Sequence, residues 1–565
     1  MSPETLLLLV LAAVVVIVAV RWVADRTGLP AAALLTVVGI GYALLPGPNL
    51  SLDPHVVLTL VIPPLLYSAA LDSSLTAIRR NLRTVVSLSV LLVAATAIVI
   101  GVGFGLFVAG ATVAAGIALG AAVAPPDPVA ALAVGRRASL PPRLITLIQG
   151  EGLLNDATAL TILAVAVSAV QGEGYSTPAA LGQFLLASVD GVAAGVAVAY
   201  AVRPLRRLRS DPLSSNAISL ATPFVAYLLG ESVHVSGVLA VVVAGLIIGH
   251  NNPSWASGAT RLQTVAVWRL VDFLLEGFVF LLIGQQLPHV LAGLNEYSTS
   301  TIVTAAAITL GVVLLLRPLW LWLTEHLPQA LHTRLTEQDL DGDGEPDSEP
   351  GSSPAGLRKV VRPGRLTGRE IVVLSWAGTR GVITLAAIFT LPLVTDRGDP
   401  FPDRNLLLFC AFLTVLVTLV GQGLTFGPLV RKLGLRADVA DQARMRNEAR
   451  AASVEAALRR LDEMEAERHD DVDERAITGI RAQLRTRLDR YRHRLDLLDN
   501  ADSGEIPLSP EYEAALRLRR SVIEAQRMEL LHWRDVGRLP DEGLRALERE
   551  LDHEEGLLPD RATPR

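Results

Sequence analysis

Apolar runs long enough to cross a lipid bilayer recur along most of this 565-residue chain. A spanning helix needs roughly 17–25 apolar residues to cross about 30 Å of hydrocarbon, and about thirteen such runs lie between Leu6 and Val430. Lipid cannot satisfy open backbone N–H and C=O groups, so the runs must be helical. The sequence therefore predicts an all-α polytopic membrane protein with spans at residues 4–23, 29–46, 55–70, 84–108, 110–134, 144–170, 180–202, 213–230, 235–250, 264–287, 299–323, 368–392 and 405–430.

Composition divides the chain into a membrane region and a hydrophilic tail. Hydrophobic residues make up 51% of the chain, charged residues only 19%, and the mean hydropathy is +0.43, which excludes an ordinary soluble protein. Residues 1–433 form the predicted membrane domain, interrupted by a cytoplasmic loop at 326–367. Residues 436–565 mix acidic and basic residues around apolar ones at helical spacing, as in the stripe Ile480, Leu484, Leu488, Tyr491 and Leu495. This pattern predicts a cytoplasmic α-helical tail rather than a catalytic domain.

The distribution of basic residues orients the predicted spans. Positively charged residues concentrate on the cytoplasmic side of membrane proteins. Loops after even-numbered spans carry only Arg397 and Arg404. Loops after odd-numbered spans, with the span ends beside them, carry Arg21, Arg26, Arg79, Arg80, Arg83, Arg136, Arg137, Arg143, Arg203, Arg206, Arg207, Arg209, Arg261, Arg317, Arg334, Arg358, Lys359, Arg362, Arg365 and Arg369. We therefore expect a multi-pass protein of the cell membrane with its N-terminus outside and its C-terminus in the cytoplasm.

The hydrophilic loop contains one weak metal motif. Its segment Asp339-Leu340-Asp341-Gly342-Asp343-Gly344 matches the first half of a calcium-binding loop. The twelfth position is Pro350, where such a loop requires a bidentate Glu. A solvated acidic linker is the favoured interpretation, and Ca²⁺ binding by Asp339–Glu349 stays an open alternative.

Asp127 interrupts a predicted span in the segment Pro125-Pro126-Asp127-Pro128. Ionisable groups at membrane depth are costly, so a carboxylate there indicates function. Three prolines within four positions remove backbone donors and predict a break in the helix near mid-span, where free carbonyls and helix ends face a cavity. A structural kink alone would need one proline and no acid.

The next predicted span presents Glu151, Asn155 and Asp156. At about 100° per residue, Glu151 and Asn155 share one helix face and Asp156 lies beside it. Asp156 could then face the broken helix and alternate between a proton and a cation, while Glu151 is held in a structural ion pair. The alternative is a polar interior helix in which Asn155 hydrogen-bonds neighbouring helices.

A buried cation is expected in the twelfth span, at Arg380. Arg380 cannot readily lose its charge, so at that depth it needs a carboxylate or exposed helix carbonyls. Gly378 and Gly381 on either side permit a second break. Broken helices in the fifth and twelfth spans, one in each half and crossing at mid-membrane, are typical of inverted-repeat secondary transporters.

Four motifs together resemble the monovalent cation:proton antiporters of the NhaP and NHE type. In chain order they are the segments Asp127–Ala130, Gly150–Asp156, Ser236–Leu246 and Trp376–Gly381, and this order is that of the family. The resemblance covers about residues 1–433 and leaves the tail outside. It implies a homodimer in which spans four to six and eleven to thirteen form a mobile transport bundle. It also implies that Asp156 carries the ion or proton, that Asp127 lies at the helix crossing and that Glu151 pairs with Arg380.

Some positions depart from that family's pattern. Relatives often have an acid at Ser68, a hydroxyl at Gly152 and a Thr at Pro126. Side-chain oxygens are thus fewer here, although the Pro126 carbonyl remains available. The predicted site for a monovalent cation and H⁺ is Asp156, Asp127, Asn155, Pro126 and Ser68. The expected cation is Na⁺, with K⁺, Li⁺ or mixed specificity left open.

Two further acids lie in the tenth predicted span. Asp272 and Glu276 are one helical turn apart. They could line an access path to the site, and packing or a cytoplasmic helix end is an equal alternative.

The pattern predicts a secondary active antiporter that exchanges a cation for H⁺ by alternating access, for pH and cation homeostasis. One Asp beside Asn155 favours electroneutral exchange. The protein is expected to be no enzyme, to need no cofactor, to bind no nucleic acid and to lie in the lipid bilayer. A cation channel would favour a continuous pore lined by repeated carbonyls or acid rings. An intramembrane aspartyl protease would carry Gly-x-Gly-Asp, which is absent around Asp127 and Asp156.

Overall fold

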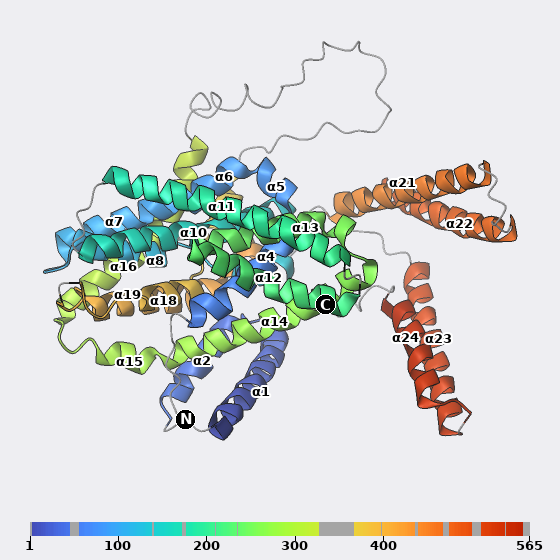
Figure 1. The fold of residues 1–565 in the computed structure, drawn as a ribbon, viewed down its shortest axis with the longest axis horizontal. Helices are drawn as coiled ribbons and strands as arrows, with labels where there is room; N and C mark the ends of the chain where they lie inside the picture. Colours follow the sequence, from blue (N-terminus) through green and yellow to red (C-terminus); the bar gives the residue numbers. More distant parts are fainter. Residues whose placement is uncertain are drawn as a thin grey trace, which may run out of the picture. The chain divides into compact units, whose positions relative to one another are not determined.

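Helices form nearly all of the regular structure of this protein (Figure 1). The structure is a computed structural model, and it describes residues 3–45, 56–137, 140–171, 177–208, 211–233, 235–326, 366–396, 398–435, 439–466, 474–499, 510–536 and 538–556. Across these residues the β-structure is a single bridge between Val394 and Pro400. The predicted all-α class is confirmed.

The chain divides into two compact units, Met1–Ala437 and Asp438–Arg565. The helices of the first unit are α1 (Pro3–Thr27), α2 (Ala31–Ala43), the π-helical η1 (Val57–Val61), α4 (Ile62–Leu71), α5 (Leu75–Arg80), α6 (Leu82–Val86), the π-helical η2 (Ser87–Leu91), α7 (Leu92–Phe107), α8 (Val113–Val123), α9 (Pro128–Arg137), α10 (Pro142–Gln171), α11 (Thr177–Leu208), α12 (Pro212–Ser232), α13 (Gly237–Trp255), α14 (Gly258–Gln285), α15 (Leu287–Ala292), α16 (Thr299–His326), α17 (Gly368–Trp376), α18 (Val382–Phe389), α19 (Arg404–Leu416), the π-helical η4 (Val417–Gln422) and α20 (Gly423–Leu433).

Seven helical stretches of the described residues are long and apolar enough to cross a membrane. They begin at Leu7, Leu82, Pro142, Leu186, Pro212, Thr299 and Arg404. Shorter apolar stretches are Ala31–Ala43, Val57–Leu71, Val113–Val123 and Gly237–Asn252. The predicted count of about thirteen is not confirmed by this measure, because length and hydropathy alone miss short and broken spans.

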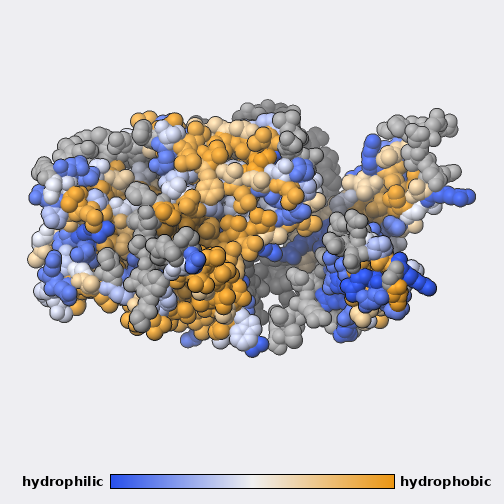
Figure 2. Space-filling view, turned by 60° about the horizontal axis from the view of Figure 1, so that its bottom comes forward, coloured by the Kyte–Doolittle hydropathy of each residue, from blue (hydrophilic) through white to orange (hydrophobic). Residues whose placement is uncertain are grey.

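The surface of the first unit is itself apolar. Figure 2 shows hydrophobic residues covering much of one face of this unit. Large side chains on several helices point outward, and Leu8, Leu106 and Leu315 are 67%, 71% and 69% exposed. Exposed apolar area on this scale is typical of a protein surrounded by lipid.

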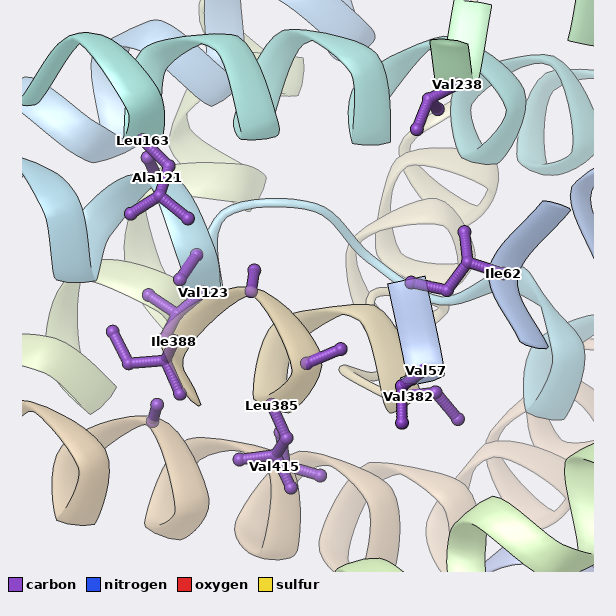
Figure 3. Close-up of a cluster of buried hydrophobic side chains, with 14 of the residues drawn as sticks. Val57, Ile62, Ala121, Val123, Leu163, Val238, Val382, Leu385, Ile388 and Val415 are labelled. Atoms are coloured by element: carbon purple, nitrogen blue, oxygen red, sulfur yellow. The ribbon is translucent and has the colours of Figure 1, made fainter. Parts of the chain in front are cut away.

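The helices of the first unit form two packing groups. In one group α7, α8, α9, α10, α16, α17, α18 and α19 contact one another. In the other, α14 packs on α1, α2, α4 and α12. Figure 3 shows the apolar core around α18, where Ile388 lies beside Val123 and Leu385 lies beside Val415. Apolar contacts on two sides hold α18 between α8 and α19.

Two helices of the first group are interrupted. The first break separates the end of α8 at Val123 from the start of α9 at Pro128. The second separates the end of α17 at Trp376 from the start of α18 at Val382. Proline rings exclude backbone donors at the first break, and Gly378 and Gly381 lie in the second. Both predicted breaks are confirmed.

The second unit contains α21 (Val439–Ala466), α22 (Glu474–Asp499), α23 (Pro510–Asp535) and α24 (Asp541–Gly556). Ala451 and Val454 of α21 form a small apolar core with Leu488, and Leu484 and Tyr491 pack against it. The predicted helical tail is therefore observed as helices. The predicted stripe is wrong at Ile480, whose side chain is 48% exposed and does not belong to this core.

Residues 327–365 of the predicted loop at 326–367 lie outside the described residues, and so does the calcium alternative at Asp339–Glu349.

Candidate functional site

The two helix breaks are hydrogen-bonded to each other. The backbone N–H of Asp127 donates to the Thr379 carbonyl at 2.6 Å. In return, the Thr379 hydroxyl donates to the Asp127 carbonyl at 3.0 Å. Polar backbone that no helix satisfies is thus paired across the crossing, as burial requires.

Asp127 is fixed at this crossing by two helix N-termini. Its carboxylate accepts from the backbone N–H of Val129 at 2.9 Å, in the first turn of α9. It also accepts from the backbone N–H of Val382, the first residue of α18. Helix N-termini carry positive partial charge, so both ends favour a carboxylate here. A side chain at Gly381 would overlap this carboxylate. Two backbone donors thus hold the Asp127 carboxylate in place at the crossing.

Arg380 binds the free carbonyls at the C-terminal ends of two helices, α8 and α17. Its guanidinium donates to the carbonyls of Val123 at 3.0 Å and Ala124 at 3.3 Å, at the end of α8. It also donates to the Gly378 carbonyl, just after α17. Cations are stabilised at helix C-termini, where the last carbonyls lack partners. Of the two environments expected for Arg380, the structure shows the helix carbonyls.

Glu151 is paired with a different arginine from the one predicted. Both guanidinium NH₂ groups of Arg317, on α16, donate to the two Glu151 carboxylate oxygens, one of them at 2.8 Å. Both side chains are buried. The Nε of Arg317 donates to the Leu374 carbonyl at 2.9 Å. The predicted Glu151–Arg380 pair is therefore corrected, because a bidentate fork from Arg317 fills the carboxylate.

Asn155 ties α10 to the first break. Its amide nitrogen donates to the Pro126 carbonyl at 3.0 Å. Its amide oxygen is buried and has no hydrogen-bond partner among the described residues. The Pro126 carbonyl, expected as an ion ligand, is thus already accepting one hydrogen bond. One of its two lone pairs remains for a ligand.

Asp156 differs from Asp127 and Glu151 in having no polar partner. Its side chain is 4% exposed, and no hydrogen bond or ion pair to its carboxylate is found among the described residues. The charge of Asp127 acts on it and opposes ionisation. Burial without a partner disfavours the bare ionised carboxylate of Asp156. A bound proton or a bound cation would remove this cost.

A cavity of about 290 Å³ opens beside Asp156. Asp127, Pro126 and Ser68 of the predicted site also line it, whereas Asn155 does not. Its remaining polar lining comes chiefly from Asp72, Ser73, Gln149, Asp272, Glu276 and Thr384. Among the described residues, no group of three or more His, Cys, Asp or Glu side chains is arranged to hold a metal ion.

The sequence interpretation missed Arg317 and left Asp272 undecided. Arg317 lies within the predicted span 299–323, and the charge pattern groups it with the cytoplasmic arginines, although a charge inside an apolar run itself indicates function. Asp272 lines the cavity and accepts a hydrogen bond from the Ser68 hydroxyl. No spacing in the sequence links residues 68 and 272.

Two interrupted helices that cross beside a partnerless carboxylate define a secondary transporter of small cations. Residues 10–432 match the family described as "Sodium/hydrogen exchanger, transmembrane". The chain belongs to this family, whose members are transporters rather than enzymes. It is a multi-pass membrane protein.

Relatives and solved structures agree with this assignment. An uncharacterized Na⁺/H⁺ exchanger of Mycobacterium tuberculosis is 34% identical over 91% of this chain and 89% of its own length. An uncharacterized Na⁺/H⁺ exchanger of Escherichia coli is 29% identical over 91% of each chain. The sodium proton antiporter MjNhaP1 of Methanocaldococcus jannaschii matches 75% of this chain and 97% of its own with a TM-score of 0.55. At 17% identity, that match shows the fold alone.

Proposed function

We propose that this protein exchanges Na⁺ for H⁺ across a membrane, with Asp156 as the group that binds either ion. The observation that carries the proposal is the buried Asp156 carboxylate, which faces a cavity and has no polar partner among the described residues. Family membership supports Na⁺ and H⁺ as the exchanged ions. The K⁺ alternative has no better support.

The other polar groups of the site position Asp156 rather than compete for its ion. Asp127 is engaged by two backbone N–H groups, Glu151 by Arg317, and Arg380 by helix carbonyls. Asp127, Glu151 and Arg380 thus all have partners, as the cost of burying an unpaired charge requires, and Asp156 does not. A cation at Asp156 would find further oxygens at Pro126 and Asp127.

The cycle follows from competition at one carboxylate. With Na⁺ bound, Asp156 is ionised and neutralised by the cation; with H⁺ bound, it is neutral. Both states cross the low-dielectric interior at lower cost than the bare carboxylate. Exchange results when the cavity faces each side of the membrane in turn. This requirement separates an antiporter from a channel, which would conduct without a proton gradient.

The site also argues against an intramembrane protease. Aspartyl chemistry needs two carboxylates that share a proton. Here Asp127 is held by backbone donors of α9 and α18 while Asp156 has none. Two acids in such unequal surroundings suit one ion-binding group and one positioning group.

Proteoliposomes with an internal pH dye test the proposal. Adding Na⁺ should collapse an imposed pH gradient in the wild type, and K⁺ and Li⁺ should be compared at equal concentration. Asp156→Asn should abolish the response while the purified protein keeps its elution volume and thermal stability. Wild-type rates in that variant would overturn the assignment to Asp156.

We further propose that the protein lies in the cell membrane as a homodimer, with its N-terminus outside and its C-terminal unit in the cytoplasm. The bias of basic residues supports this orientation. Accessibility of single cysteines introduced near residues 4 and 450, in a Cys410→Ser background, would test it with a membrane-impermeant reagent.

A further inference from the structure

A second pair of carboxylates lines the cavity beside Asp156. Asp272 and Glu276 lie four residues apart on α14 and so share one face of that helix. They come from the packing group of α1, α2, α4 and α12, whereas Asp127 and Asp156 come from the group of α8, α9 and α10. The cavity is therefore bordered by acids from both groups of helices.

These two acids have little to balance their charge. Asp272 accepts from the Ser68 hydroxyl, and its other carboxylate oxygen is buried without a hydrogen-bond partner among the described residues. The charged groups near Glu276 are Asp127, Asp272 and Arg21 of α1. Arg21 also pairs with Asp25 at 3.5 Å. Like charges one turn apart destabilise a helix unless a cation or proton offsets them.

An independent feature of the cavity also points to a ligand. Thr384 of α18 lines the cavity and is 1% exposed, yet its hydroxyl has no hydrogen-bond partner among the described residues. Buried hydroxyls are normally hydrogen-bonded, and Thr in a helix usually finds a carbonyl one turn back. A free hydroxyl oxygen in a cavity that carboxylates also line is suited to a monovalent cation, which prefers oxygen ligands.

We propose that Asp272, Glu276, Ser68 and Thr384 form a second binding position for Na⁺ in this cavity, distinct from the position at Asp156. The inference rests on the proposed exchange function and adds a second binding position on the Na⁺ pathway. A cation attracted to the α14 carboxylates is concentrated next to Asp156 before it displaces the proton there. Asp272 and Ser68 then determine the affinity for Na⁺, and Asp156 carries the exchange itself.

Transport kinetics provide the first test. In proteoliposomes, Asp272→Asn should raise the KM for Na⁺ by about tenfold or more, equivalent to losing one ionic ligand, while the maximal rate stays within about twofold. Asp190→Asn, an exposed acid on α11 away from the cavity, serves as the matched control and should leave both values unchanged. An unchanged KM in folded Asp272→Asn would overturn the proposal. If that variant does not fold, Ser68→Ala keeps the carboxylate, and an unchanged KM there has the same consequence.

Binding without transport provides the second test and separates the two proposals. Ligands that bind the folded state raise its melting temperature. Purified Asp156→Asn should still be stabilised by NaCl relative to choline chloride, and Asp156→Asn combined with Asp272→Asn should lose that effect. No Na⁺-dependent stabilisation in Asp156→Asn, or one that survives in the double variant, would refute the second position. Failure of the proposed exchange would instead show as no Na⁺-driven collapse of the pH gradient in the wild-type protein.

Discussion

Arg317 holds the Glu151 carboxylate through both of its terminal nitrogens, and this pair joins α16 to α10 inside the membrane unit. The same guanidinium donates to Leu374, in the last turn of α17. One side chain therefore connects three helices of the group that carries Asp156. The pair holds α10 in place five residues before Asp156, the proposed ion-binding residue.

Breaking this pair should destabilise the protein strongly. Removing one partner of a buried ion pair costs about 3–5 kcal/mol because the other charge is left without compensation. Glu151→Gln and Arg317→Gln should each lower the melting temperature, and the double variant should lose much less than the sum of the two. Strictly additive losses would contradict the pairing.

Arg380→Gln is the matched comparison for that cycle. Its guanidinium donates to carbonyls rather than to Glu151, so Glu151→Gln and Arg380→Gln should be closer to additive than the Arg317 cycle. A stronger coupling of Glu151 to Arg380 than to Arg317 would favour the pairing that the family resemblance implied.

The helix crossing should not tolerate a side chain at Gly381. A Cβ there would overlap the Asp127 carboxylate, which is fixed by the N-termini of α9 and α18. Gly381→Ala should therefore displace Asp127 and abolish transport while membrane insertion persists. Gly311→Ala on α16 is the control, because a Cβ at Gly311 meets no atom within 4 Å. Full activity of Gly381→Ala in the pH-gradient assay would show that the crossing relaxes easily.

The sequence was sufficient to predict the features that depend on local chemistry. Prolines around Asp127 and glycines around Arg380 indicate where two helices break, because they remove donors and steric restraint locally. The partners of the buried charges depend instead on which helices meet. Arg317 and Arg380 are both buried cations that need compensation. Which of them reaches Glu151 depends on how α16 and α17 pack around α10. The contact between Ser68 and Asp272 is non-local in the same way.

Gly152 shows how packing accounts for a departure from the family pattern. The family resemblance implies a hydroxyl at this position, but a Cβ here would lie 2.6 Å from Cγ of Pro128. Gly152→Ser should therefore reduce stability and transport instead of improving Na⁺ affinity. Gly182→Ser on α11, where nothing lies within 4 Å, is the matched control. A lower KM for Na⁺ in a stable Gly152→Ser protein would contradict this packing argument.

The exchange should be electroneutral, because one partnerless carboxylate carries either one Na⁺ or one H⁺. Asp127 is the other acid of the crossing, and two backbone N–H groups already hold its carboxylate in place, so we assign it no role as a proton carrier. The charge moved per turnover is then zero. A potassium diffusion potential applied to proteoliposomes at fixed Na⁺ and H⁺ gradients should change neither the rate nor the end point. Potential-driven Na⁺ movement would show that a second proton is carried. Repeating the measurement with Glu276→Gln and with Asp272→Asn would then test whether an α14 carboxylate carries the second proton. Potential dependence that persists in both variants would indicate Asp127 instead.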